Sequence, residues 1–144
     1  MEPQSILLVE DNDDDAELTV RAFSQANIAN ALIRVSDGVE ALDYLFARGS
    51  YSLRNTRNLP ILVLLDLKLP RLDGIDVLKA IRAHEATRYL PVVMLTSSDH
   101  DRDRLAAYHN QVNSYVRKPV DYDQFVDAAR QLGLYWVVLN LPIS

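Results

Sequence analysis

Short apolar runs recur along the chain, with polar segments between them. They lie at residues 6–9, 31–35, 61–65, 92–95 and, more weakly, 114–116. They lack the alternation of a half-exposed strand and therefore predict strands of a parallel sheet covered on both faces. Apolar residues at helical spacing lie between and after them, among them Ala16, Val20 and Phe23 first and Phe125, Ala128 and Ala129 last. The alternation predicts a doubly wound α/β fold with five strands and five helices.

Two segments depart from this simple alternation. Residues 48–58 are rich in glycine, serine and asparagine, which predicts a long exposed loop before the third strand. Residues 121–144 predict a C-terminal helix followed by an apolar tail. We find no interdomain linker or repeat, so we expect a single domain over residues 1–144 without a separate output domain.

Composition narrows the class of protein. With 49% hydrophobic and 24% charged residues in 144, the chain has the balance of an ordinary globular domain. The absence of cysteine excludes a disulfide scaffold, a zinc-thiolate site and a thiol nucleophile. A net charge of −5 argues against nucleic acid as a partner. No apolar stretch reaches the length of a membrane span, and we expect a cytoplasmic protein without membrane contact.

Polar side chains gather where the predicted strands end. Glu10 and Asp11 follow the first strand, Asp66 the third and Thr96 the fourth, while Lys118 follows the fifth. In an open parallel sheet the carboxyl ends of the strands share one edge, and ligands bind there. We therefore expect three carboxylates, a hydroxyl and an ammonium around one crevice.

Electrostatics indicates what this crevice binds. Two carboxylates about 4 Å apart repel each other by about 4 kcal/mol at an effective dielectric of about 20, so three converging acids favour a cation. Carboxylate oxygens suit Mg²⁺ or Mn²⁺ rather than zinc or copper. With a cation in place, a phosphoryl group can bind opposite it, supported by Lys118 and Thr96. The pattern favours phosphoryl transfer to an aspartate.

Each residue taken alone also has a simpler interpretation. Glu10 and Asp11 can cap the following helix, and Thr96 can be an ordinary strand residue or part of a turn. Lys118 can be a solvated lysine before a proline. Asp66 is harder to explain in this way, because it ends a strongly apolar run where an unpaired charge is costly. Their convergence on one sheet edge favours the functional interpretation.

In combination, these motifs resemble the receiver domain of bacterial two-component response regulators, and the resemblance covers essentially the whole chain. The matching segments are LVEDN at 8–12, LLDLKLP at 64–70 with Asp73 and Gly74, LTS at 95–97 and YVRKP at 115–119. The first acidic pair is Glu-Asp where Asp-Asp is commoner in the family, and Ser97 stands where alanine is frequent. The resemblance implies a flavodoxin-like sheet with strand order 2-1-3-4-5.

The resemblance also implies roles for individual residues. Asp66 would accept the phosphoryl group from a phosphohistidine on a sensor histidine kinase. Mg²⁺, for which Mn²⁺ could substitute, would be held by Glu10, Asp11, Asp66 and the backbone carbonyl of Lys68. Phosphate binding and switching would fall to Lys118, Thr96, Ser97 and Tyr115, with Tyr115 rotating inward after Thr96 moves. Pro119 is a candidate for a cis peptide bond.

Output is expected through protein contacts, to a downstream target or a phosphotransfer protein. We expect no conventional enzyme activity. The apolar C-terminal segment predicts a homodimer interface that includes Leu134, Tyr135, Trp136 and Val138, although part of it can instead cover the domain's own core. The long loop and this tail are similar to those of single-domain regulators that serve phytochrome-type histidine kinases.

Three other functions remain as alternatives. The first is a receiver-like module that binds partners without phosphorylation, although such modules usually lose the acceptor or its lysine. A flavodoxin-like redox protein shares the fold, but the acidic residues 13–15 would repel a phosphate after the first strand. A haloacid-dehalogenase-type phosphatase would need a second acid where Lys68 stands.

Overall fold

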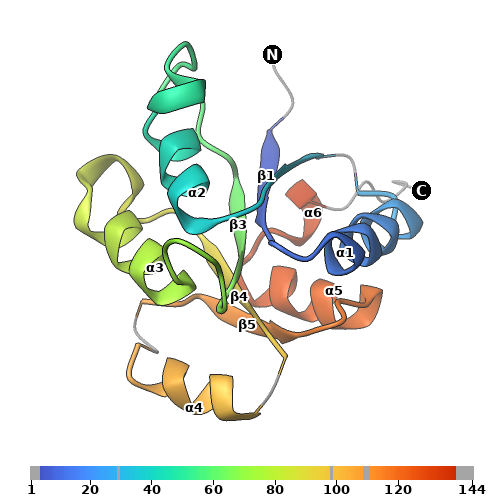
Figure 1. Cartoon of the computed structure of the whole chain (residues 1–144). Coiled ribbons are helices and arrows are strands. Elements are labelled where there is room, and N and C mark those ends of the chain that lie inside the picture. Colours follow the sequence, from blue (N-terminus) through green and yellow to red (C-terminus); the bar gives the residue numbers. More distant parts are fainter. Residues whose placement is uncertain (1–3, 29, 98, 109–110, 139–144) are drawn as a thin grey trace.

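The computed structural model describes residues 4–28, 30–97, 99–108 and 111–138 and contains a five-stranded parallel sheet (Figure 1). The strands are β1 (Ser5–Val9), β2 (Ala31–Val35), β3 (Leu62–Asp66), β4 (Val92–Thr96) and β5 (Ser114–Arg117), and their order in the sheet is β2-β1-β3-β4-β5. The helices are α1 (Asp13–Gln25), α2 (Gly38–Leu45), α3 (Gly74–Ala83), α4 (Asp99–Ala106), α5 (Tyr122–Gln131) and the short α6 (Tyr135–Val138). The predicted fold class and strand order are confirmed.

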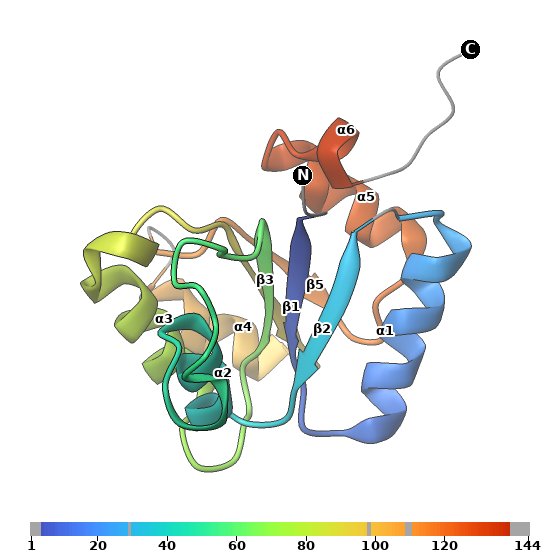
Figure 2. The same cartoon turned by 90° about the horizontal axis from the view of Figure 1, so that it is seen from above.

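Helices cover both faces of the sheet, as Figure 2 shows. Alternate residues of each strand enter different hydrophobic clusters, because successive side chains of a strand point to opposite faces. Leu7 and Val9 of β1 pack in the cluster with α2 and α3, while Ile6 and Leu8 pack in the cluster with α1 and α5. Burial on both faces explains why the strands appear in the sequence as continuous apolar runs.

Short polar residues fix where the helices begin. The side chain of Asn12 accepts a hydrogen bond from the backbone N–H of Asp15, and Asp121 accepts one from Gln124 in the same way. Each bond satisfies a donor that the first turn leaves free, so α1 and α5 start close to the carboxyl ends of β1 and β5. No helix within the described ranges has the length and apolar character that crossing a membrane requires.

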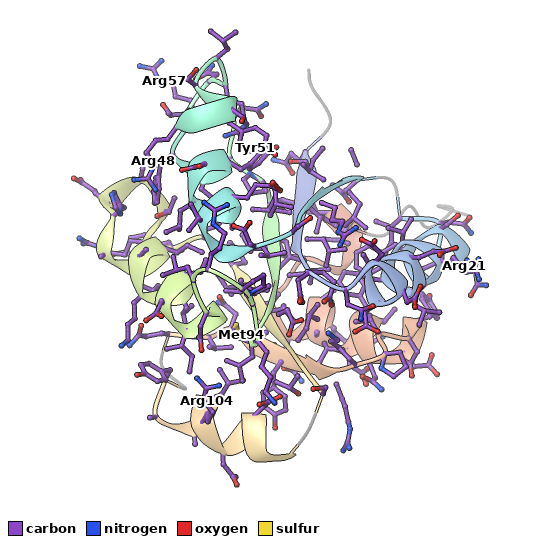
Figure 3. The ribbon with its side chains drawn as sticks, viewed as in Figure 1. Arg21, Arg48, Tyr51, Arg57, Met94 and Arg104 are labelled. Carbon is purple, nitrogen blue, oxygen red and sulfur yellow. The ribbon has the colours of Figure 1, made fainter. Side chains whose placement is uncertain are left out.

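The predicted loop at residues 48–58 is present, but part of it is ordered by its own contacts. A 3₁₀ turn spans Gly49–Tyr51, and the ring of Tyr51 packs edge-on against Tyr44 at 5.2 Å between centroids. The guanidinium of Arg54 lies 3.8 Å from the centre of the Tyr44 ring and donates to the backbone carbonyl of the same residue. Leu53 at its tip is fully exposed. The loop projects from the end of α2, with Arg48, Tyr51 and Arg57 along it (Figure 3).

The C-terminal segment is two helices where one helix and a tail were predicted. Gly133 has a φ of +70°, which ends α5 and turns the chain into α6. Val138 on α6 is completely buried in the core cluster beneath α5, and Leu134 packs against the same cluster. The predicted interface role of Val138 is therefore wrong, because its own domain covers this side chain. The side chains of Tyr135 and Trp136 lie outside the described part of the chain.

Candidate functional site

Three carboxylates meet at the carboxyl edge of the sheet. Val9 pairs with Leu65 in the register of β1 and β3, so Glu10, the next residue, lies beside Asp66. Glu10, Asp11 and Asp66 each place a carboxylate oxygen within 4.8 Å of the others. Glu10 is fully buried and Asp66 is 5% exposed, whereas Asp11 is open to solvent. The structure therefore brings together the three acids that the strand ends predict.

Arg34 braces the backbone at the first of these acids. From β2 it donates two hydrogen bonds to the carbonyl oxygen of Glu10, at 3.0 and 2.9 Å, and one to Asp13 at 2.8 Å. The backbone N–H of Glu10 in turn donates to Val35 at 3.0 Å. These bonds hold the turn after β1 in place, so the Glu10 carboxylate points into the site from a fixed backbone.

Lys118 bridges the carboxylates from the end of β5. Its Nζ lies 2.9 Å from Oε1 of Glu10, 3.0 Å from Oδ2 of Asp66 and 2.9 Å from Oδ2 of Asp15. The backbone N–H of Lys118 donates to the carbonyl of Thr96 at 2.7 Å, which ties the lysine to the end of β4. The peptide bond between Lys118 and Pro119 is cis. Sequence analysis missed Asp15, because it stands in a run of acids that looks like the ordinary first turn of a helix.

Burial and charge shift the pKa values of this cluster. Burial raises the pKa of Glu10 to about 7, and the neighbouring Asp66 adds to the rise while Lys118 opposes it. For Lys118, burial disfavours the charge, but hydrogen bonds to Glu10, Asp15 and Asp66 outweigh it and raise its pKa above the usual value. The lysine therefore remains an ammonium among acids that compete for it.

Thr96 ends β4, which lies next to β3 and its terminal Asp66. Asp66 pairs with Leu95 and Thr96 with Arg117, so Thr96 lies between β3 and β5 at the same edge. Its side chain is completely buried, and among the described residues Oγ1 has no hydrogen-bond partner. Ser97 turns towards α4, where its hydroxyl lies 3.4 Å from Oδ2 of Asp101. Tyr115 on the neighbouring β5 is 48% exposed.

The segment between β3 and α3 folds tightly around Asp66. The backbone N–H of Lys68 donates to Oδ1 of Asp66 at 3.3 Å, and that of Gly74 donates to the carbonyl of Leu67 at 2.9 Å. Asp73 caps α3 by accepting from Ile75 at 2.7 Å. These bonds form a compact turn, so the Asp66 carboxylate stands on a fixed backbone.

This turn is also tied to α4. Asp73 pairs with Arg104 at 2.9 Å, and Figure 3 shows Arg104 on α4. The ammonium of Lys68 lies 3.5 Å from Oδ1 of the buried Asp101. Two ion pairs thus connect the residues around Asp66 to one helix, and sequence analysis gave no indication of Asp101 or Arg104.

The donor set suits a small hard cation. Three carboxylate oxygens within 4.8 Å of one another are oxygen ligands of the kind that Mg²⁺ and Mn²⁺ prefer. The open side of Asp11 leaves room for the water ligands that Mg²⁺ keeps. Beside the acids, Lys118 supplies a charged donor, and the hydroxyl of Thr96 has no hydrogen-bond partner among the described residues. A cation on the acids, together with these two donors, would neutralise the charge of an anionic group.

Comparison with known families agrees with this geometry. The model of the response regulator receiver domain matches residues 6–130. The chain belongs to the response regulator receiver family. The match runs from β1 through α5 and includes each of the strand ends described above.

Several known receivers are similar to this one over nearly its full length. The probable methanogenesis regulatory protein FilR2 of Methanothrix harundinacea is 41% identical over 96% of this chain and 87% of its own. The response regulator Rcp1 of Synechocystis is 34% identical over 99% and 95%. Its Mn²⁺-bound crystal structure superposes with a TM-score of 0.74, at 33% identity over 98% of this chain and 100% of the other.

A solved bacteriophytochrome regulator is also similar. The structure of the bacteriophytochrome response regulator AtBRR superposes with a TM-score of 0.89, at 46% identity over 98% of this chain and 100% of that chain. Because the match covers 98% of this chain, it includes the loop before β3 and the C-terminal segment as well as the sheet. The chain is therefore similar to solved phytochrome response regulators, the subgroup that the loop and the C-terminal segment indicated.

Proposed function

We propose that this receiver domain accepts a phosphoryl group on Asp66 from the phosphohistidine of a sensor histidine kinase. The observation that carries the proposal is the position of the Asp66 carboxylate. It contacts the nearly buried ammonium of Lys118 at 3.0 Å and clusters with two other acids, at the end of a fully buried strand. Inert carboxylates are not usually buried in such surroundings, because the desolvation is costly.

The chemistry follows from these positions. A carboxylate oxygen of Asp66 attacks the phosphorus, and the bond from phosphorus to the histidine nitrogen breaks as the new bond to oxygen forms. The electron pair of the broken bond stays on the imidazole, which takes up a proton, and an acyl phosphate remains on Asp66. The Lys118 ammonium then pairs with a phosphoryl oxygen in place of the free carboxylate.

Glu10, Asp11 and Asp66, with the backbone carbonyl of Lys68, are the proposed holders of Mg²⁺. Their clustered oxygens support this assignment, and Rcp1 has been crystallised in a Mn²⁺-bound form. When bound, the cation offsets negative charge on the transferring group. Burial is the main cause of the raised pKa of Glu10 and the neighbouring Asp66 adds to it, so a bound cation would lower this pKa by offsetting the negative charge.

Phosphorylation is proposed to move Thr96 and Tyr115. The Thr96 hydroxyl lacks a partner among the described residues, so a new dianion on the adjacent strand gives it an acceptor. Its movement frees space next to β5, where Met94 pairs with Tyr115. The half-exposed Tyr115 ring then turns inward, and the surface around β5 changes shape.

The proposed partners follow from the family and its subgroup. The phosphoryl donor is a histidine kinase of the phytochrome type, which the similarity to AtBRR supports. The output is a protein contact to a downstream target or phosphotransfer protein. A homodimer through the C-terminal segment, including Leu134, Tyr135 and Trp136, is part of the proposal, and Val137 on α6 is 49% exposed beside them.

Intact mass measurement tests the phosphoryl transfer. The parent and Asp66→Asn are incubated with Mg²⁺ and a small acyl-phosphate donor, with and without a chelator. We expect one phosphoryl adduct on the parent, none on the variant and none without the cation. If the parent stays unlabelled by both the small donor and an autophosphorylated phytochrome-type kinase, the proposal is wrong and the phosphorylation-independent binding module takes its place.

A further inference from the structure

Lys118 has a third carboxylate partner that lies outside the metal-type cluster. Its ammonium contacts Asp15 at 2.9 Å, the same distance as its contact with Glu10, while Asp66 lies at 3.0 Å. The contact with Asp66 has the geometry of a hydrogen bond, and the contacts with Glu10 and Asp15 are close ion pairs. Lys118 is only 11% exposed, and Asp15 therefore holds a nearly buried charge.

Asp15 is fixed more firmly than an ordinary surface acid. It is the third residue of α1, and its backbone N–H donates to the Asn12 cap at 2.9 Å. Its carbonyl oxygen accepts from the hydroxyl of Thr19 at 3.0 Å. Since its backbone is held on both sides, the carboxylate reaches Lys118 from a rigid position.

The other two partners of Lys118 are engaged by the proposed chemistry. Asp66 becomes the acyl phosphate, and Glu10 belongs to the oxygens clustered for the cation. Asp15 is absent from that cluster within the described part of the chain. It is thus the one carboxylate that keeps its contact with Lys118 while the others change partners.

We propose that Asp15 is a positioning residue that holds the Lys118 ammonium at the phosphoryl site and thereby sets the rate of transfer to Asp66. This rests on the proposed function. A lysine has a long side chain with many rotamers, and ordering it costs free energy. A close ion pair with a carboxylate on a rigid helix reduces that cost before the phosphoryl donor arrives.

Asp15→Asn tests this inference, because it keeps the size of the side chain and removes its charge. Asp14→Asn is the matched control, since Asp14 is exposed on the same turn and its substitution makes the same change in net charge. The maximal rate of phosphorylation by a small acyl-phosphate donor is measured at saturating Mg²⁺, together with the thermal midpoint. We expect Asp15→Asn to be at least about fivefold slower than the parent, which corresponds to about 1 kcal/mol in the activation free energy. Asp14→Asn should stay within about twofold of the parent.

Asp15→Glu separates positioning from a general effect on folding, because it restores the carboxylate. We expect it to recover most of the lost rate, while all three variants keep similar thermal midpoints. Equal rates for Asp15→Asn and Asp14→Asn, or a faster Asp15→Asn, would overturn the inference. A loss that appears only at low Mg²⁺ and is absent at saturating Mg²⁺ would also overturn it, since Asp15 would then act on the cation. If the parent itself takes no phosphoryl group, it is the proposed function that fails.

Discussion

Gly74 packs directly against the backbone of Asp66. A Cβ atom at position 74 would lie 2.3 Å from the carbonyl oxygen of Asp66 and 2.8 Å from Cα of Leu67. Real Cβ atoms do not approach backbone so closely, and only glycine allows α3 to begin there. The turn that carries Asp66 thus depends on a residue eight positions further along the chain.

Gly74→Ala should therefore displace Asp66. We expect a loss of about 3 kcal/mol in unfolding free energy, measured by urea titration, together with a slower phosphorylation rate. Gly133→Ala is the control, because its φ of +70° strains alanine but no heavy atom lies within 4 Å of the added carbon. It should cost about 1 kcal/mol and leave phosphorylation unchanged. If the two substitutions change the unfolding free energy and the phosphorylation rate equally, the close contact between Gly74 and Asp66 is contradicted.

Thr96→Val should stabilise the unphosphorylated protein. The variant keeps the shape of the side chain and removes a buried hydroxyl that lacks a partner among the described residues, so we expect a gain of about 1 kcal/mol. Thr19→Val provides the contrast, because the hydroxyl of buried Thr19 donates to Asp15 at 3.0 Å. It should destabilise by about 1 kcal/mol. The urea midpoints of both variants are compared with that of the parent. A loss of stability in Thr96→Val would show that the Thr96 hydroxyl is already hydrogen-bonded in the parent.

Ionisation of the Glu10 carboxyl should make the cation-free protein less stable as the pH rises. Its pKa is about 7 in the folded protein against 4.5 in the unfolded chain, so the folded state holds the proton more tightly. Stability therefore falls between about pH 4.5 and 7 and levels off above that. At about 1.4 kcal/mol per pKa unit, the gain from Glu10→Gln should be about 2 kcal/mol larger at pH 8 than at pH 5.

Two controls complete the pH experiment. Glu85→Gln, at an exposed position, should show no comparable pH dependence. Mg²⁺ at pH 8 should stabilise the parent and have a much smaller effect on Glu10→Gln, because the cation offsets the ionised carboxylate. A stability difference between the parent and Glu10→Gln that stays constant from pH 5 to pH 8 would disprove the raised pKa.

The sequence predicts the sheet well because burial leaves a direct signal. Strands covered on both faces must be apolar throughout, and the five predicted runs match β1 to β5 to within about one residue at each end. The convergence of Glu10, Asp66, Thr96 and Lys118 also follows, since parallel strands end at a common edge. The main features of the site are thus accessible from strand ends alone.

The supporting contacts are less predictable, because they depend on where helices lie relative to the sheet. Asp15 and Asp101 look like ordinary acids near helix starts, and only the packed structure brings them to Lys118 and Lys68. Val138 was misassigned for a related reason. An apolar residue suits an interface and a core equally well. The turn at Gly133 directs the chain so that the Val138 side chain faces the core.

The proposed dimer can be tested at Val137, which is half exposed on α6. Val137→Asp places a charge in an interface of this kind, so we expect the variant to be monomeric where the parent is dimeric, as measured by light scattering at several concentrations. Val20→Asp on α1 is the control, because Val20 is similarly exposed at 45%. The dimer would be ruled out if the parent is monomeric both before and after phosphorylation.

The central claim is that Asp66 itself carries the phosphoryl group. Borohydride reduces an aspartyl phosphate to homoserine, so peptide mapping of the labelled and reduced protein identifies the acceptor directly. We predict homoserine at position 66 and at no other aspartate, in an amount equal to the phosphoryl adduct in the intact mass. Reduction at Asp11, or a borohydride-resistant phosphate on the hydroxyl of Thr96 or Ser97, would contradict the account.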